Sequence, residues 1–383
     1  MTATFSIAGV TPRATCAPSD RPELASIVRD LYAAGKTFAF AGGGTELELG
    51  NAPRELDTVV RTTALDRVIE YSPEDQTITV EAGVRVATLD ALLLQHDQVL
   101  PIDVGDRRNA TIGGAIATNA FGAQRHRHGS IKDLIVGIEI VRPDGVPARG
   151  GGKVVKNVAG FDLPKLLVGS LGTLGAIASA TFRVFPKPAV TRAAIVHASP
   201  GGAFFAACLD DRSLEPVAVV HYPALGGIVL TFAGVPASVE QQLADVTALA
   251  GAHGVAIEPL DAGALERCAA IESAVRTAGT WRWTTRTTAT GARTAAGPGV
   301  SLALEVGYPT FGVTLSSADD DAPIDALVRA RGTSVTFHAM PQRARGRIDA
   351  WGEPPPSFPL MRALKHNFDP KGLCNPGRFV GGL

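Results

Sequence analysis

Three short segments rich in glycine and threonine interrupt the first half of the chain and constrain its fold more than any other feature. GGGT at residues 42–45 follows the apolar run 38–41, ATIGGAIATN spans residues 110–119, and GSLGTLG spans residues 169–175. Glycine lets a backbone approach a ligand closely, and consecutive N–H groups in a tight loop bind anions. Taken alone, GGGT is explained equally well by a surface turn, and residues 110–119 are explained slightly better by close helix packing. Three of them in one region favour a long cofactor that carries phosphates.

The composition excludes several classes of protein. Of 383 residues, 45% are hydrophobic and 19% are charged, which argues against a disordered, highly charged chain. The net charge of −1 offers no overall field for a nucleic-acid backbone or an anionic membrane. The length indicates two or three domains.

The cysteines predict a reducing compartment. The four are far apart and form no C-x-x-C pair, which disfavours a disulfide framework, a structural zinc site and a self-contained iron–sulfur cluster. The N-terminus has no secretory pattern, so we expect a cytoplasmic protein. The uncharged run 166–182 is marginal in length for a membrane span, and its alternation from residue 176 predicts a strand with one buried face. The cysteines are Cys16, Cys208, Cys268 and Cys374.

Hydrophobic periodicity and breakers predict an α+β chain. Asp20 and Glu23 are spaced as a capping box for a helix over residues 20–34, and two prolines at 186 and 188 indicate a domain boundary. Residues 281–299, with their threonines, glycines and arginines, are expected to form an irregular exposed loop. Strands are expected at 38–41, 56–61, 68–71, 77–81, 134–142, 176–184, 216–221, 227–233, 301–306 and 334–337, and further helices at 88–95, 238–250 and 360–368.

Four motifs in order resemble a known family. GGGT, then ATIGGAIATNAFG at 110–122, KNVAGFDLPKLLVGSLGTLG at 156–175 and FDPKGLCNPGRF at 368–379 are similar to the FAD-linked oxidases of the vanillyl-alcohol oxidase type. Within that family the resemblance is greatest to the FAD-binding subunits of bacterial glycolate oxidases. It implies a PCMH-type FAD-binding domain of two subdomains over residues 1–187. A ferredoxin-like α+β cap over 188–345 and a C-terminal helix and tail over 346–383, which returns to the FAD domain, complete the expected fold.

The resemblance also implies which residues hold the cofactor. The GGGT loop would wrap the FAD pyrophosphate, the segment from Thr111 would line the flavin, and residues 169–175 would contact the pyrophosphate and adenosine side. No histidine lies next to the GGGT loop, so we expect non-covalent FAD. The implied cofactor-binding residues are Gly42, Gly43, Gly44, Thr45, Pro101, Thr111, Gly113, Gly114, Thr118, Asn119, Gly169, Gly172, Thr173, Gly175, Ile177 and Asn375.

The catalytic residues are less well indicated. Relatives that oxidise glycolate or D-lactate carry an H-x-G-D-G-N-x-H segment in the cap, which binds a metal, and this chain has no such segment. His128 and Lys156 are candidates for the general base because they lie close in sequence to the flavin-lining motifs. His126 and His128 have no third ligand nearby in the sequence, so no metal site is predicted.

The implied function is that of an FAD-binding subunit in a glycolate oxidase-like complex. It would take part in oxidation of a 2-hydroxy acid, glycolate or D-lactate, beside a catalytic flavoprotein subunit and an iron–sulfur subunit that takes the electrons. Association with a membrane would be peripheral, through the complex. Two alternatives stay open: a non-catalytic FAD-binding assembly subunit, and a stand-alone FAD oxidase of another alcohol or sugar.

Overall fold

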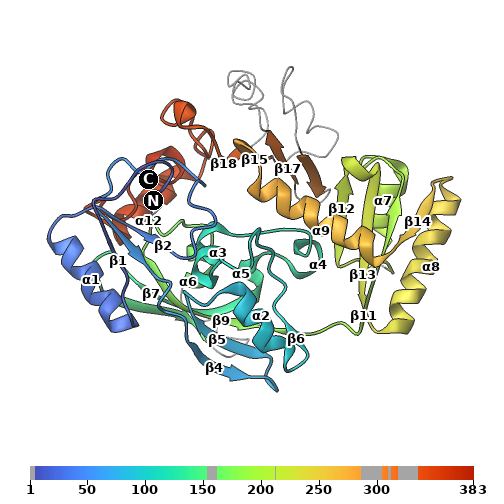
Figure 1. Cartoon of the computed structure of the whole chain (residues 1–383), viewed down its shortest axis with the longest axis horizontal. Helices are drawn as coiled ribbons and strands as arrows, with labels where there is room; N and C mark the ends of the chain where they lie inside the picture. Colours follow the sequence, from blue (N-terminus) through green and yellow to red (C-terminus); the bar gives the residue numbers. More distant parts are fainter. Residues whose placement is uncertain (1–4, 153–161, 212, 286–303, 309–311, 318–334) are drawn as a thin grey trace. The chain divides into compact units, whose positions relative to one another are not determined.

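The computed structural model describes residues 5–152, 162–211, 213–285, 304–308, 312–317 and 335–383. The chain divides into two units (Figure 1). Unit 1 contains residues 1–121, 130–186 and 345–383, and unit 2 contains residues 122–129 and 187–344. The short segment 122–129 thus belongs with unit 2 although unit 1 flanks it on both sides. The functional domains expected over 1–187, 188–345 and 346–383 remain a prediction.

The first sheet of unit 1 is parallel and is backed by a capped helix. Strands β1 (Ala14–Cys16), β3 (Thr58–Arg61) and β2 (Phe38–Ala41) lie in the order β1-β3-β2. Helix α1 (Arg21–Ala33) begins where the Asp20 carboxylate accepts the Glu23 N–H at 2.8 Å. The expected capping box is only half formed, since the Glu23 carboxylate accepts from Ser19 instead. Leu24 and Val28 of α1 then pack into one core with β2 and β3.

The second sheet of unit 1 has five antiparallel strands. Its order is β4 (Val68–Ser72), β5 (Thr77–Glu81), β9 (Ala176–Arg183), β7 (Ile135–Val141) and β8 (Pro147–Gly151), and the predicted hairpin is the β4–β5 pair. Helices α2 (Val86–Leu94) and α3 (Ile112–Thr118) contribute to its core. The other elements are β6 (Gln98–Val99), β10 (Phe185–Pro186), α5 (Ile131–Leu134), α6 (Leu163–Leu167), α12 (Phe358–Phe368) and the turn η3 (Val380–Gly382).

Strand β9 has both faces buried, so the prediction of one buried face was wrong. Ser179 and Thr181, expected on the open face, are only 4% and 9% exposed. The strand is central in its sheet, with Ala178 in the core shared with α1 and Ala180 in the core shared with α2 and α3. A register shift against β7, between Glu139 and Ile140, accompanies this change of side.

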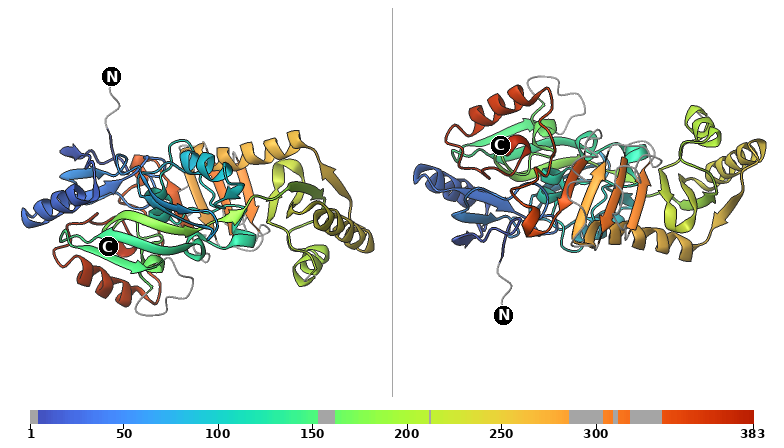
Figure 2. Two further views of the ribbon diagram at one scale, coloured as in Figure 1. Left: turned by 90° about the horizontal axis from the view of Figure 1, so that it is seen from below. Right: turned by 90° about the horizontal axis from the view of Figure 1, so that it is seen from above.

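Unit 2 contains one antiparallel sheet of eight described strands. Strands β11 (Val190–Val196), β12 (Ala218–Tyr222), β13 (Gly227–Gly234) and β14 (Ile257–Leu260) join α7 (Ala203–Asp210) and α8 (Pro236–Ala252) in the βαββαβ order of a ferredoxin-like fold. Helix α9 (Ala262–Thr277) follows, and then β15 (Trp281–Thr285), β16 (Leu304–Tyr308), β17 (Gly312–Ser317) and β18 (Val335–Ala339). The full order is β14-β11-β13-β12-β16-β17-β15-β18, and Figure 2 shows these strands in yellow-green to orange. The short turns of helix are α4 (Arg125–His128), η1 (Pro223–Leu225) and η2 (Gln342–Ala344).

The predicted exposed loop at 281–299 was wrong in its first part. Residues 281–285 form β15, which lies between β17 and β18. Trp281 and Trp283 are fully buried, because alternate residues of an internal strand face the core. Residues 286–299 lie outside the described part of the chain. Among the described residues, none of the helices is long and apolar enough to cross a bilayer.

Candidate functional site

The GGGT loop packs directly on the residues that precede α3. A side chain on Gly42 would place Cβ 2.0 Å from Thr111 Oγ1, and one on Gly43 would place it 1.6 Å from the Asn109 carbonyl oxygen. The Gly43 N–H also donates to Thr111 Oγ1 at 3.4 Å. These two glycines are therefore required by contacts within the chain. Gly44 differs, because its φ is +82° and a Cβ there would meet only the far end of Leu47 at 3.6 Å.

Helix α3 shows the same division between packed and open glycines. Thr111 caps the helix and accepts the Gly114 N–H at 3.3 Å. Gly113 lies against Ala82, whose carbonyl accepts the Gly113 N–H at 2.7 Å, and a Cβ on Gly113 would come within 2.7 Å of the Ala82 methyl. On Gly114 a Cβ would meet nothing but Thr111 Oγ1 at 3.2 Å. Gly114 therefore leaves open space beside the helix, whereas Gly113 does not.

Residues 169–175 attach to the end of α3. The Gly169 N–H donates to the Ile116 carbonyl, and the Leu171 N–H donates to the Ala117 carbonyl, both at 2.9 Å. Asn119 ends the helix in the left-handed region, with φ 51°. Its Oδ1 atom is buried and accepts no hydrogen bond from the described residues. A buried acceptor of this kind is costly unless a ligand or water satisfies it.

The C-terminal tail joins the same cluster. Phe38 of β2 donates to the Leu373 carbonyl at 2.9 Å and accepts the Asn375 N–H at 2.6 Å, and the Asn375 side-chain amide donates to the Leu171 carbonyl. Asn375 is 3% exposed, and its Oδ1 atom likewise has no partner among the described residues. The GGGT loop, α3, residues 169–175 and the tail therefore meet in unit 1.

The remaining predicted cofactor residues all lie in unit 1. The Thr118 hydroxyl donates to the Gly114 carbonyl at 2.9 Å, and the Thr173 hydroxyl donates to Ser170 at 2.8 Å. Ile177 lies in the core of the five-stranded sheet. Thr45, Pro101, Gly172 and Gly175 lie in turns or loops of unit 1. Their contact with a cofactor stays a prediction.

Only one of the two candidate bases lies in the described part of the chain. His128 ends the four-residue helix α4, is partly buried and belongs to unit 2. Lys156 lies outside the described residues. Within the part of the chain that is described, no three His, Cys, Asp or Glu side chains converge as a metal ligand set would.

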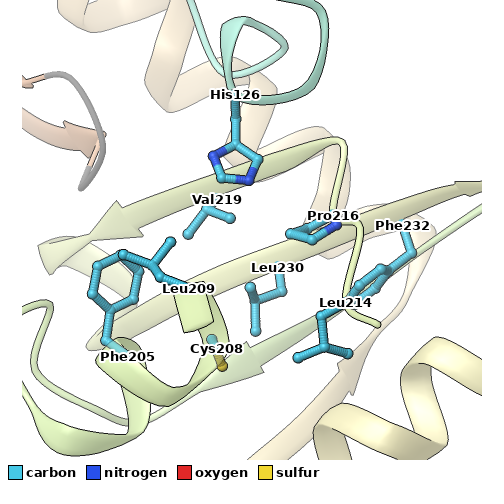
Figure 3. A pocket seen from close by; sticks show the side chains of 9 residues that line it. All are labelled: His126, Phe205, Cys208, Leu209, Leu214, Pro216, Val219, Leu230 and Phe232. Carbon is cyan, nitrogen blue, oxygen red and sulfur yellow. The ribbon is translucent and has the colours of Figure 1, made fainter. Parts of the chain in front are cut away.

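A small apolar cavity of about 90 Å³ lies within unit 2 (Figure 3). Burial raises the pKa of Cys208 to about 11, so this thiol stays protonated at neutral pH. Burial, and then the charge of Arg127, lower the pKa of His126, which keeps the imidazole neutral. The cavity suits an apolar group and has no charge to offer a phosphate. Its lining residues are His126, Phe205, Cys208, Leu209, Leu214, Pro216, Val219, Leu230 and Phe232.

His338 is a second histidine whose environment disfavours its charged form. Its Nε2 atom lies 3.1 Å from the Thr284 hydroxyl. Burial, and then the positive charges of Arg282 and Arg276, lower the pKa of His338 to about 3. The imidazole is therefore neutral throughout the physiological range.

We expect the stability of unit 2 to fall in mild acid because of His338. The unfolded chain binds a proton near pH 6.5, whereas the folded chain binds it only near pH 3. The contribution is complete above pH 6.5, and it declines with acidification by at most about 1.4 kcal/mol per pH unit. The free energy of unfolding is measured by urea unfolding followed by tryptophan fluorescence. Between pH 4 and 6 it should change less steeply with pH in His338→Gln than in wild type. The exposed His253→Gln is the control, and equal slopes in wild type and His338→Gln would contradict the assignment.

Comparison with known proteins identifies the cofactor-binding part. Residues 12–150 match the family model described as an FAD binding domain. The chain is 35% identical over 179 residues to the glycolate oxidase subunit GlcD of Bacillus subtilis, which covers 46% of this chain and 38% of that protein. It is 35% identical over 170 residues to the D-lactate dehydrogenase of Archaeoglobus fulgidus, covering 44% and 38% of the two chains. It is 37% identical over 122 residues to the glycolate oxidase subunit GlcE of Escherichia coli, covering 32% and 35%.

The sequence matches cover part of each relative, and the fold match covers nearly all of this chain. The chain spans less than two fifths of the length of these curated relatives. A solved alkyldihydroxyacetonephosphate synthase superposes with a TM-score of 0.67 at 18% identity, over 95% of this chain and 77% of that chain, which shows a shared fold. The shared fold confirms the predicted α+β fold. The family match confirms the predicted FAD cofactor.

Proposed function

Starting from the FAD-binding domain that residues 12–150 form, we propose that this chain is the FAD-binding subunit of a glycolate oxidase-like complex. It would take part in the flavin-dependent oxidation of a 2-hydroxy acid such as glycolate or D-lactate. The observation that carries the proposal is the meeting of the GGGT loop, α3, residues 169–175 and the tail, with two buried acceptors that have no partner among the described residues. The names of the relatives supply the substrate class.

The residues of this cluster fit a non-covalent FAD. The open side of Gly44 leaves room for a diphosphate beside the GGGT loop, and the open side of Gly114 leaves room for a flavin beside α3. The Oδ1 atoms of Asn119 and Asn375, which no described residue satisfies, suit donors of the kind that FAD carries, hydroxyl and N–H groups. When bound, FAD supplies the acceptor for the two electrons that leave the carbon bearing the substrate hydroxyl. His128 and Lys156 stay candidates for the base that takes the hydroxyl proton.

Partner subunits belong to the same proposal. GlcD and GlcE are both named as subunits of glycolate oxidase, which supports a complex with a catalytic flavoprotein subunit. An iron–sulfur subunit would accept the electrons, because the four cysteines of this chain are too scattered to hold a cluster. A cytoplasmic location stays a prediction from the same cysteine pattern.

A second candidate is an FAD-binding assembly subunit that does no turnover. The observation that favours it is the missing H-x-G-D-G-N-x-H segment. In that case the chain would hold FAD through the same residues, and the hydroxy acid would react on another subunit.

One anaerobic titration distinguishes the two candidates. We expect the purified chain to be yellow and to lose its visible absorbance when glycolate or D-lactate is added without oxygen. A 3-hydroxy acid is the matched control, since it carries the same carboxylate and hydroxyl groups but has the hydroxyl on the β-carbon instead of the α-carbon. A yellow protein that no 2-hydroxy acid bleaches would support the assembly role, and a colourless one that added FAD does not restore would refute FAD binding.

A further inference from the structure

The sheet of unit 2 has two unlike faces at its β17-β15-β18 end. The register places Arg282 opposite Ser316 and Thr284 opposite both Thr314 and Thr336. Residues directly opposite on neighbouring strands project from the same face. These polar side chains therefore share one face. The other face carries Trp281, Trp283, Leu315 and Phe337, which are all buried.

The polar face holds a buried cation with no described counter-charge. Arg282 is 9% exposed, and its buried Nε atom has no hydrogen-bond partner within the described part of the chain. No ion pair between Arg282 and a described carboxylate is present. Ser316 is fully buried, and its Oγ atom also has no partner among the described residues. Burying a charge and a hydroxyl in this way is unfavourable unless a ligand supplies a counter-charge for the one and a hydrogen bond for the other.

Neighbouring groups do not neutralise Arg282. The carboxylate of Glu272, on α9, accepts from Tyr222 at 2.6 Å and lies 3.7 Å from the Arg276 guanidinium. His338 is held neutral beside the Thr284 hydroxyl. Among the described residues, this face therefore keeps a charge of +1 that no carboxylate balances.

We propose that Arg282 and Ser316 bind the carboxylate of the 2-hydroxy acid, with the Thr284 hydroxyl on the same face beside the substrate hydroxyl group. This inference rests on the proposed function for its choice of ligand. A guanidinium matches a carboxylate with two parallel hydrogen bonds, and the Ser316 hydroxyl adds a third donor. A monoanion balances the single charge, whereas a phosphate dianion would leave a buried negative charge.

The test uses the full-length chain as purified and a monocarboxylate that cannot be oxidised. Oxamate binding is measured by isothermal titration calorimetry in wild type, Arg282→Met, Arg282→Lys and Ser316→Ala. Loss of a charged hydrogen-bonding group should weaken binding about 30-fold in Arg282→Met. The oxamate affinity of Arg282→Lys should lie between those of Arg282→Met and wild type, because lysine keeps the charge but cannot donate two parallel hydrogen bonds. The control is Arg192→Met, an exposed arginine of β11 in the same unit, which should bind as wild type does.

Each outcome bears on the proposal. Circular dichroism and thermal melting identify a variant that fails to fold. If Arg282→Met does so, Arg282→Lys and Ser316→Ala decide the question. Wild type that binds no oxamate, or folded Arg282 and Ser316 variants that bind it as wild type does, would overturn the site. Loss of visible absorbance on addition of glycolate tests the proposed function independently of the carboxylate site. A chain that binds oxamate through Arg282 but never loses its absorbance supports the site and contradicts the proposed function. The reverse result keeps the function and removes the site.

Discussion

Replacing Lys365 by methionine is expected to lower the free energy of unfolding by about 3–5 kcal/mol. Lys365 of α12 is 8% exposed, and its ammonium group donates to the Thr173 carbonyl at 2.8 Å, the Cys374 carbonyl at 2.7 Å and the Asp369 carboxylate at 2.6 Å. Asp369 is itself 2% exposed and accepts the Cys374 N–H at 2.9 Å. Removing the ammonium would leave a buried carboxylate without its cation.

This loss should also loosen the tail from residues 169–175. Lys365 is the one described side chain that donates to both Thr173 and Cys374, so it ties the tail to the predicted cofactor site. Urea unfolding measures the effect, and the double variant Lys365→Met/Asp369→Asn should recover part of it because no unpaired charge remains. Lys36→Met, at an exposed position, should change stability by less than about 0.5 kcal/mol. Equal midpoints for Lys365→Met and wild type would show that the buried pair contributes nothing.

The second large effect is expected at Gly43. Gly43→Ala would force a Cβ atom to within 1.6 Å of the Asn109 carbonyl, and backbone on both sides must move to relieve it. Overpacking of this kind costs about 1–3 kcal/mol. Because the GGGT loop and α3 share this contact, we expect the variant to purify without FAD. The ratio of visible to ultraviolet absorbance of the purified protein measures the FAD content.

A matched pair separates packing from cofactor contact. In Gly114→Ala the methyl group would lie 3.2 Å from Thr111 Oγ1, so the Thr111 side chain must shift slightly, and the variant should fold but bind FAD more weakly. Gly251→Ala, in α8 with nothing within 4 Å, should leave FAD binding unchanged and stabilise the helix by about 0.5–1 kcal/mol. Normal FAD affinity in Gly114→Ala would mean that α3 does not approach the cofactor at this point.

Local signals predicted a good part of the fold. The cap at Asp20, the strand before GGGT and the hairpin around residue 73 all depend on neighbours in sequence, and each was found near its predicted bounds. The predictions were wrong for β15 and for the exposed face of β9. In both cases the burial of the strand depends on partners far along the chain. The alternation of Trp281 and Trp283 around Arg282 was the available signal for β15.

The sequence by itself determined that this chain holds glycine-rich loops in the order found in FAD-linked proteins, and the family match over residues 12–150 agrees with it. Only the tertiary structure decided what each glycine does. Gly43 and Gly113 are required by contacts with Asn109 and Ala82, while Gly44 and Gly114 leave space that a ligand can fill.

The tertiary structure likewise decided which polar groups lack partners. Asn375 is brought to residue 171, and Arg282 to Ser316, by pairing between segments far apart in the chain. Whether a buried group finds its hydrogen bond depends on the atoms that surround it in space. The order of residues alone does not specify those atoms, which is why the carboxylate site at Arg282 was absent from the sequence-based expectations.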